Sequence, residues 1–272
     1  YPGRVIDVGI AEAEAVASAA GMAYQGAHPV VALYATFLNR GFDQLLMDVA
    51  LHRAGVTFVL DRAGVTGADG ASHNGVWDIA MCSMIPGLRL AAPRDEQTLR
   101  ARLREALDVD DAPTVIRYRK GSLPEPMPAL RSVGGVDILF DEAVADSSAR
   151  VLIVGTGACA PDAIEAARRL AADGVSVTVA DPQWMIPICP DLATLVRDYD
   201  CVVSVEDGIV QGGFGWSLRD AVAETGVPVR CLGVPQGFPE HGDRAAMIAQ
   251  FGFDADGIER TARELVERIG ER

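Results

Sequence analysis

The sequence is poor in the residues that build metal sites and disulfides. It holds only four histidines, none of them spaced as a pair of ligands, and its odd number of cysteines includes no CxxC motif. We therefore predict no transition-metal site built by this chain, and thiols that stay reduced and mostly buried. The five cysteines are Cys82, Cys159, Cys189, Cys201 and Cys231.

Basic residues and long apolar runs are scarce as well. The formal net charge is −14, which argues against nucleic acid and anionic membrane as main partners. We find neither a signal peptide nor an apolar run long enough to span a bilayer, and we predict a cytoplasmic protein. The sequence starts at Tyr1 and enters a strand-like segment almost at once, so we expect it to be the C-terminal part of a longer protein.

Apolar residues, in contrast, make up 49% of the sequence, and they follow two periodicities. Short β-branched runs predict strands, and longer segments with apolar residues at helical spacing predict helices. Because the strands are apolar nearly throughout and helices lie between them, they indicate a parallel sheet covered on both faces. In the first part of the chain the predicted strands are 4–8, 30–36, 56–60, 88–93 and 114–119, and the predicted helices are 10–26, 42–53 and 95–108.

A segment rich in proline and glycine interrupts the alternation. Residues 121–135 hold three prolines and three glycines, a composition typical of a linker. Beyond it the predicted strands are 151–154, 175–180, 201–205 and 227–234, and the predicted helices begin with 161–174 and 215–224. The sequence therefore predicts an α/β protein of two three-layer domains with mostly parallel sheets. The first domain is residues 1–121, the linker is 122–149, and the second domain is 150–272.

The loop DRAGVTGADGASHNG, at 61–75, directly follows the predicted strand 56–60. Open α/β sheets bind ligands past the carboxyl ends of their strands, and glycines let the backbone approach a ligand closely. Arg62 and His73 can carry positive charge, and Asp69 can orient a hydroxyl or an imidazole. Asp-Gly and Asn-Gly are also turn formers, and a loop histidine can be idle. The presence of Arg62 and His73 in one glycine-rich loop favours a binding site.

A glycine-rich turn in the second domain matches a nucleotide-binding pattern. VLIVGTGACA places Gly155, Gly157 and Ala160 in a G-x-G-x-x-A pattern between a strand and a helix, and Asp181 ends the next strand. This is the fingerprint of a dinucleotide site, in which the acidic residue binds a ribose hydroxyl. The alternative is a tight turn without a ligand, in which the glycines let the helix pack closely on the sheet. Since a single match of this kind is weak, we favour the tight turn.

Further candidate side chains follow the first two predicted strands. Glu12 lies in the first turn of a helix, where the helix dipole alone would favour a carboxylate. Glu14 lies two residues on and points to another face, so only one of the two can face a pocket. Phe37 and Arg40 follow the second strand, where they either hold a flat heterocycle between them or cap the core.

Several segments form a recurring pattern in this order and at these separations. They are DVGIAE (7–12), LYATFLNRGFDQ (33–44), DRAGVTGADGASHNG (61–75) and IRYRKG (116–121), followed in the second domain by DPQWMIPI (181–188) and VEDGIVQGGFG (205–215). Together they closely resemble the deoxyxylulose phosphate synthase family of the transketolase-like thiamine diphosphate enzymes, over essentially the whole chain. The 61–75 loop is the specific part, because plain transketolases carry a different version rich in aspartate and serine.

The resemblance implies which domains are present. The family has three α/β domains, and the first binds the diphosphate and Mg²⁺ through a GDG…N motif. This sequence has no GDG, and its only asparagines are Asn39 and Asn74, so it is similar to the pyrimidine-binding and C-terminal domains alone. The implied cofactors are thiamine diphosphate and Mg²⁺, with the metal and the diphosphate held by the first domain, and the implied assembly is a homodimer. We expect this chain alone to be inactive.

The family's chemistry also implies a role for each residue near the cofactor. The implied reaction joins pyruvate to D-glyceraldehyde 3-phosphate, releases CO₂ and yields 1-deoxy-D-xylulose 5-phosphate, a precursor of isoprenoids and thiamine. By resemblance, Glu12 shares a proton with N1′ of the aminopyrimidine and so drives deprotonation of the thiazolium C2. Phe37 stacks on the aminopyrimidine, and Arg40 lies close by. The family's C-terminal domain is not known to bind a dinucleotide.

The acceptor sugar phosphate is implied to lie on the opening loop. Arg62 and Arg117 suit the phosphate, because guanidinium forks match phosphate oxygens. His73 and Asp69 suit the hydroxyl and the developing alkoxide, which makes His73 a catalytic candidate. The implied acceptor site consists of Tyr34, Arg62, Asp69, His73 and Arg117.

Two positions depart from the family pattern and leave alternatives open. Ala13-Glu14 replaces the usual Gln-His after the catalytic glutamate, and Arg119 replaces a proline. The retained candidates together favour part of a deoxyxylulose phosphate synthase. The change at Ala13-Glu14 favours a non-catalytic partner or paralogue. A β-type subunit of a split transketolase or 2-oxoacid dehydrogenase is the third hypothesis.

Overall fold

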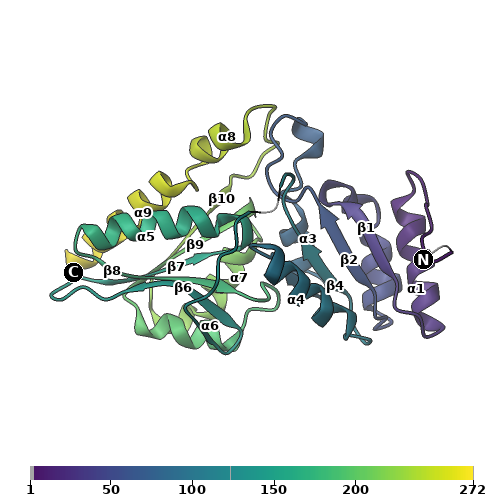
Figure 1. The fold of residues 1–272 in the computed structure, drawn as a ribbon, viewed down its shortest axis with the longest axis horizontal. Coiled ribbons are helices and arrows are strands. Elements are labelled where there is room, and N and C mark those ends of the chain that lie inside the picture. The colour runs from purple at the N-terminus through teal and green to yellow at the C-terminus, as the bar shows by residue number, and fades with distance from the viewer. Residues whose placement is uncertain (1–2, 123, 272) are drawn as a thin grey trace.

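The computed structural model, which describes residues 3–122 and 124–271, contains two α/β domains that lie side by side (Figure 1). Each domain is built on a sheet whose strands are mostly parallel, with helices packed against it. The N-terminus lies at the outer end of the first domain and the C-terminus at the opposite end of the molecule. The predicted fold class is confirmed.

The first domain carries a four-stranded, fully parallel sheet. Its elements are α1 (Glu12–Tyr24), β1 (Val30–Tyr34), the 3₁₀ helix η1 (Ala35–Arg40), α2 (Phe42–Gln44), the π-helical η2 (Leu45–Ala50), β2 (Thr57–Asp61), the 3₁₀ turn η3 (Ala71–His73), α3 (Asp78–Ser83), β3 (Arg89–Ala91), α4 (Glu96–Leu107) and β4 (Thr114–Arg117). The strand order is β1-β2-β4-β3. Phe58 and Leu60 of β2 are fully buried, which fixes this strand in the middle of the domain. Helix α4 begins at a capping box, in which the Asp95 side chain accepts a hydrogen bond from the backbone N–H of Thr98.

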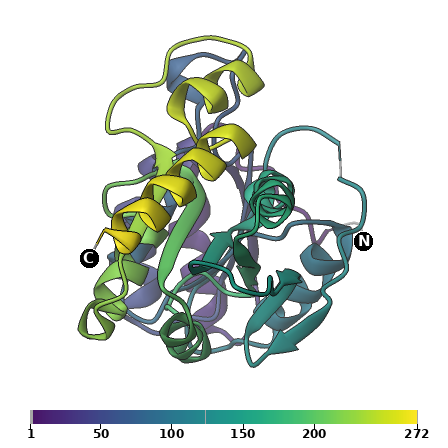
Figure 2. The ribbon, with the colours of Figure 1, turned by 90° about the vertical axis from the view of Figure 1, so that its left-hand side faces the viewer.

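The second domain carries a six-stranded mixed sheet. Its elements are β5 (Arg131–Val133), β6 (Val136–Glu142), β7 (Arg150–Gly155), the 3₁₀ turn η4 (Gly157–Cys159), α5 (Ala160–Ala172), β8 (Ser176–Pro182), α6 (Pro190–Leu195), the 3₁₀ turn η5 (Val196–Asp198), β9 (Cys201–Ile209), α7 (Phe214–Ala221), the 3₁₀ turn η6 (Ala223–Thr225), β10 (Val229–Val234), α8 (Arg244–Phe251) and α9 (Ala255–Gly270). The order is β10-β9-β7-β8-β6-β5. The first four strands run parallel to one another, and β6 runs antiparallel to both of its neighbours, β8 and β5. Helices α5 and α9 pack together on one face, and α6 and α7 lie on the other (Figures 1 and 2). In α9, Ile258, Ala262 and Leu265 recur at helical spacing and are buried, so this helix presents one apolar stripe to the domain.

The predicted linker is where the structure differs most from the sequence prediction. Within 122–149, β5 and β6 form an antiparallel hairpin that pairs with β8 and so belongs to the second sheet. The turn between them is Gly134-Gly135, and Gly134 has a φ of +55°, which favours glycine. An aspartate carboxylate, that of Asp191, packs where a side chain at position 134 would lie.

Two segments of the first domain also differ. Residues 4–8, predicted as a strand, form no strand, and Val5 is 86% exposed. An apolar run becomes a strand only where a neighbouring strand can pair with its backbone. The helix predicted over 42–53 is α2 continued by the wider π-helical turns of η2. Among the residues that the structure describes, no helix is both long enough and apolar enough to cross a membrane.

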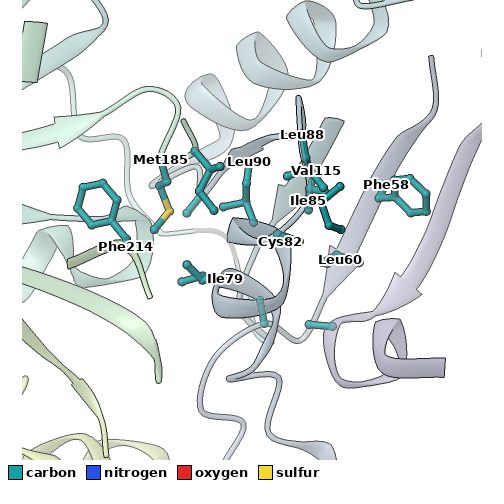
Figure 3. Packing of buried hydrophobic residues seen from close by; sticks show 14 of the residues in the cluster. Phe58, Leu60, Ile79, Cys82, Ile85, Leu88, Leu90, Val115, Met185 and Phe214 are labelled. Atoms are coloured by element: carbon teal, nitrogen blue, oxygen red, sulfur yellow. The ribbon is translucent and has the colours of Figure 1, made fainter. Parts of the chain in front are cut away.

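One continuous core joins the two domains. Leu90 of β3 and Met185 of the second domain belong to the same buried cluster, together with Ile79 and Phe214 (Figure 3). The backbones pair as well, since Met185 N–H donates to the Leu90 carbonyl at 2.7 Å and Leu90 N–H donates to the Ile186 carbonyl at 2.9 Å. The domains are therefore packed as one body.

A buried carboxylate caps one helix of the second domain. Glu206 on β9 is 1% exposed, and its two carboxylate oxygens accept hydrogen bonds from the backbone N–H groups of Phe214 (2.8 Å) and Gly215 (2.9 Å) at the start of α7. Burial raises the pKa of Glu206 to about 7, against the opposing effect of these N–H donors. The VEDGIVQGGFG segment thus has a structural role as a helix cap.

Candidate active site

The 61–75 loop follows β2 at the carboxyl edge of the first sheet, as predicted. Two backbone hydrogen bonds between Gly64 and Gly75, of 2.7 and 2.9 Å, close its neck. Asn74 is fully buried inside the loop, where its amide oxygen accepts from the backbone N–H groups of Thr66 (2.8 Å) and Gly67 (3.3 Å). The loop is therefore held in one shape by its own polar groups.

Aromatic rings from the end of β1, from η1 and from the loop meet beside it. Tyr34 and Phe37 stack with ring centroids 5.6 Å apart and an interplanar angle of 17°. His73 meets Phe37 edge-on at 5.7 Å. The Arg62 guanidinium lies 4.0 Å above the centre of the Tyr34 ring, within cation–π range. Four of the predicted site residues are thus in mutual contact.

The charged part of the cluster adds Asp69 and one residue that the sequence reading passed over. Lys120 donates to both carboxylate oxygens of Asp69, at 2.7 and 2.9 Å, while Arg62 Nη1 lies 3.6 Å from the same carboxylate. The hydrogen bond from Lys120, with the nearby charge of Arg62, holds the pKa of Asp69 below its ordinary value. Lys120 is the only lysine in the sequence and comes three residues after the end of β4. That position, past the carboxyl end of a strand, was the signal that could have identified it.

Arg117, predicted to bind the acceptor phosphate, is paired with a buried aspartate. Its side chain is 5% exposed, and it donates from Nε to Asp78 at 2.7 Å and from Nη2 to Asp78 at 3.2 Å. Nη2 also donates to the backbone carbonyl of Asp207 at 2.8 Å. Arg117 thus links the first domain to the second, and among the described residues no hydrogen bond or ion pair joins it to Arg62, Asp69 or His73.

Glu12 and Arg40 lie at the other end of η1 from the aromatic cluster. Glu12, the first residue of α1, is 9% exposed, whereas Glu14 is exposed, so the two point to different faces as predicted. Gly41 packs against the Glu12 backbone, because a Cβ at position 41 would lie 3.3 Å from the Glu12 carbonyl oxygen. Arg40 is exposed beside it. The helix η1 therefore places Phe37 beside the aromatic cluster and Arg40 beside the start of α1.

The second domain holds the loop from behind. The buried Asp207 carboxylate accepts from Val65 N–H at 2.9 Å and from Arg244 Nη2 at 2.7 Å. Arg244 also donates to the Val65 carbonyl at 3.0 Å. Gly64, with φ of +79°, leaves room for Asp207, since a Cβ there would lie 2.1 Å from the carboxylate. The shape of the loop therefore depends on both domains.

The turn that resembles a dinucleotide site is explained by packing. A Cβ at Gly155 would lie 2.6 Å from Cβ of Ala163, and one at Gly157 would lie 2.7 Å from the carbonyl oxygen of Ala92 in the first domain. Asp181 is buried and receives Arg94 Nη1 at 3.0 Å. Burial raises the pKa of Asp181 to about 7, although Arg94 opposes the rise. This carboxylate is therefore engaged with an arginine and turned away from solvent.

The residues present fit one half of the implied cofactor. In the part of the chain that the structure describes, no group of three acidic, histidine or cysteine side chains could hold a metal ion. Glu12, in contrast, is a mostly buried carboxylate that forms no hydrogen bond with the residues that the structure describes. Among those residues, no side-chain oxygen or nitrogen is both buried from solvent and without a partner. The Glu12 carboxyl group is therefore available to a partner from outside these residues, and a pyrimidine ring nitrogen that shares a proton with it is such a partner.

Comparison with known proteins defines the class first. Residues 1–126 match the transketolase pyrimidine-binding domain, and residues 142–258 match the transketolase C-terminal domain. Among solved structures, a split-gene transketolase described as an inactive β4 tetramer superposes with a TM-score of 0.84 at 27% identity, covering 98% of this chain and 85% of that one. Transketolase from Leishmania mexicana, at 22% identity, has the same fold, with a TM-score of 0.76 over 95% of this chain and 37% of its own. The chain belongs to the transketolase family.

Within that family, the curated relatives point to one branch. The chain is 52% identical to 1-deoxy-D-xylulose-5-phosphate synthase of Corynebacterium glutamicum (strain R), over 96% of this chain and 42% of the relative. It is also 52% identical to 1-deoxy-D-xylulose-5-phosphate synthase 2 of Kitasatospora griseola, over 98% of this chain and 43% of the relative. The resemblance inferred from the sequence motifs is confirmed, and the chain spans about two fifths of the length of these relatives.

Proposed function

We propose that this chain is the pyrimidine-binding and C-terminal part of a 1-deoxy-D-xylulose-5-phosphate synthase, which condenses pyruvate with D-glyceraldehyde 3-phosphate and releases CO₂. The observation that carries the proposal is the cluster in which Arg62 and Lys120 flank Asp69 beside stacked aromatic rings. Two cations at one sheet edge suit a phosphate, and the rings shape the rest of the pocket.

On the cofactor side, the chain contributes proton transfer and positioning. Thiamine diphosphate, when bound, supplies the nucleophilic carbon and the electron sink for decarboxylation. Glu12 holds a proton at the pyrimidine nitrogen, a role that suits a mostly buried carboxylate without a hydrogen-bond partner among the described residues. Phe37 and Arg40, on one short helix, bound the ring. Mg²⁺ and the diphosphate would be held by a domain beyond this chain.

On the acceptor side, the residues divide into phosphate binding and acid–base work. Arg62 and Lys120 bind the phosphate, with Lys120 in the role expected of Arg117, and Asp69 orients both cations. Tyr34 holds the Arg62 guanidinium above its ring. His73, at the rim of the cluster, donates to the oxygen that gains charge. Arg117 is a positioning residue, through Asp78.

Exposed apolar side chains support the assembly that we propose, a homodimer completed by the missing domain. Phe238 is 78% exposed and Met84 63% exposed, and both line a hollow of about 530 Å³ with Trp77 and Met81. Apolar patches of this kind are typical of protein interfaces. We place this assembly in the cytoplasm and in isoprenoid and thiamine precursor synthesis.

The test is steady-state kinetics on the chain joined to a diphosphate-binding transketolase domain, varying one substrate at a time. Arg62→Ala removes a charge-assisted phosphate contact worth about 1.5–3 kcal/mol, so the apparent affinity for glyceraldehyde 3-phosphate should fall about 10- to 150-fold. The parameters for pyruvate should move much less. Arg53→Ala is the matched control, since Arg53 is also an ion-paired arginine with a positive φ but lies on Asp111. Equal weakening of both substrates by Arg62→Ala would refute the assignment of the loop.

One observation favours a second candidate. The match to the split-gene transketolase covers 85% of that protein's length. A β-type subunit of a split transketolase therefore has the same domain content as this chain. The two functions differ in the donor substrate, pyruvate in one and a ketose phosphate in the other. Turnover with a ketose phosphate and none with pyruvate would favour the split transketolase. Failure with both donors, in a folded assembly, would favour the non-catalytic paralogue.

A further inference from the structure

A cavity of about 280 Å³ lies where the two domains meet. Its walls come from the loops after β3 and β4, Ala63 of the 61–75 loop and Leu99 of α4 in the first domain, and from the glycine-rich turn and β9 in the second. The described lining includes none of Arg62, Asp69, His73 or Lys120, so it is separate from the acceptor cluster.

The lining is rich in arginine. Arg94, Arg117 and Arg119 all face it, and its carboxylates are Asp95 and Asp207. Arg94 and Arg117 are ion-paired with aspartates outside the lining and are 5% exposed, so they are fixed in place. Arg119 is half-buried, and the described part of the chain offers it no ion pair. The Asp162 carboxylate is close enough to interact with the Arg119 charge but forms no ion pair with it, so Arg119 is the cation of the lining without a direct partner among the described residues.

Both carboxylates of the lining are already occupied by donors. The Asp95 side chain accepts from the backbone N–H groups of Thr98 (2.8 Å) and Met127 (2.9 Å). Asp207 accepts from Val65 N–H and from Arg244, as described above. Because these oxygens are satisfied from outside the cavity, they add little acceptor capacity inside it.

The two fixed arginines keep donors free. Arg117 uses Nε and Nη2, and Arg94 uses Nε and Nη1, in the hydrogen bonds formed with residues that the structure describes. Among those residues, no side-chain nitrogen is both sealed from solvent and without a partner. Nη1 of Arg117 and Nη2 of Arg94 donate to none of the residues that the structure describes, and the cavity is a space that both side chains line.

The glycine-rich turn adds a positive end to the same space. Ala158 lines the cavity at the start of the 3₁₀ turn that leads into α5, a helix of 13 residues. The N-terminus of a helix carries partial positive charge and free N–H groups, which favours an anion. Gly157 lets this turn approach Ala92, so the turn and the arginines close on one volume.

We propose that this cavity is a second anion site, which binds a small phosphorylated molecule between Arg94, Arg117, Arg119 and the turn at Ala158. Guanidinium groups match phosphate oxygens, and the volume, at the lower end of ligand pockets (about 300–1,000 Å³), limits the ligand to a small one. Arg119 is the specific contributor, because Arg94 and Arg117 are each ion-paired with an aspartate, whereas Arg119 forms no ion pair with the residues that the structure describes. The site stands independently of the proposed catalytic function.

The test is calorimetric titration of the 272-residue chain with glycerol 3-phosphate as the probe. Arg119→Gln should weaken one binding event about 10- to 150-fold, the loss expected for one charge-assisted contact, and Arg119→Lys should keep most of the affinity. Lys120→Gln is the matched control, because the neighbouring side chain faces Asp69 in the acceptor cluster and not the cavity. The cavity event should survive Lys120→Gln.

Two outcomes would overturn the second site. Wild-type chain that takes up no glycerol 3-phosphate at millimolar concentration has no such site. Binding that persists in Arg119→Gln and disappears in Lys120→Gln belongs to the acceptor cluster alone, and that result leaves the proposed function standing. Thermal unfolding of each variant, unchanged from wild type, ensures that a loss of binding reports the site and not the fold.

Discussion

Replacing Asp78 with asparagine should destabilise this protein more than any exposed charge change. Asp78 and Arg117 form an ion pair in which the two side chains are 0% and 5% exposed, with hydrogen bonds of 2.7 and 3.2 Å. The asparagine keeps the volume but leaves the Arg117 charge buried without its counter-ion. Arg117 also holds the Asp207 carbonyl, so the loss would reach the contact between the domains.

The expected magnitude follows from the burial of this pair. Removing one partner of a buried ion pair costs about 3–5 kcal/mol, because the remaining charge stays desolvated and unpaired. For a protein of this size 1 kcal/mol shifts the melting temperature by about 2–4 °C, so Asp78→Asn should lower it by about 6–20 °C. Replacing both partners by apolar residues removes both desolvated charges, so Asp78→Leu combined with Arg117→Met should cost much less than the two single changes added together.

Urea titration followed by circular dichroism measures these free energies directly. Asp43→Asn serves as the control, because Asp43 is an exposed aspartate of the same domain and should shift stability by less than about 0.5 kcal/mol. A cost below 1 kcal/mol for Asp78→Asn would show that the pair is not a structural element. Arg117 would then be free to contact substrate, and its positioning role would be refuted.

Three further predictions concern the carboxylates. In the assembly with a diphosphate-binding domain, Glu12→Gln should lower turnover by about 10²- to 10⁴-fold with an unchanged circular dichroism spectrum, and a wild-type rate would reduce Glu12 to a helix-dipole residue. The chain should not bind NAD at micromolar concentration, because Asp181 is engaged by Arg94; calorimetry showing micromolar binding that Asp181→Ala abolishes would contradict this. Burial raises the pKa of Glu206 from 4.5 to about 7, so its contribution to stability is full below pH 4.5 and is lost as the pH rises through 7. The unfolding free energy should therefore fall by up to about 3 kcal/mol between pH 4.5 and 7. Urea titrations of Glu206→Gln at several pH values should show that its unfolding free energy depends correspondingly less on pH.

The parts of the fold that the sequence predicted well are those where one periodicity dominates. Residues 56–60 are apolar apart from Thr57 and residues 151–154 are apolar throughout, because parallel strands are buried on both faces, and both became interior strands. The hairpin of β5 and β6 was hidden by neighbouring prolines, although Val-Gly-Gly-Val at 133–136 is a recognisable hairpin turn. Residues 4–8 show the converse error, a segment of strand-like composition, Arg-Val-Ile-Asp-Val, without a partner strand.

The site divides in the same way. Loop position and residue type selected Arg62, Asp69 and His73, which lie in one short segment and take part in one cluster of contacts; their role in binding stays a prediction. They were not enough to choose between Arg117 and Lys120, three residues apart, because that choice depends on Asp78 and Asp69, which capture one cation each. The ties from Asp207 and Arg244 to Val65 span 142 and 179 residues of sequence, and no local pattern signals them.

The contact between Asp207 and the 61–75 loop limits how the two domains can be exchanged. A second domain taken from another protein would need an aspartate at position 207 and an arginine at position 244. The first domain to which it is joined would need glycine at position 64 to admit the carboxylate. Recombination at the domain boundary would therefore remove the contacts that hold the 61–75 loop in shape. The residues lost would belong to the second domain, which contributes none of the proposed ligand contacts of the loop. Chimeras should therefore carry the loop and its distant anchor from the same parent.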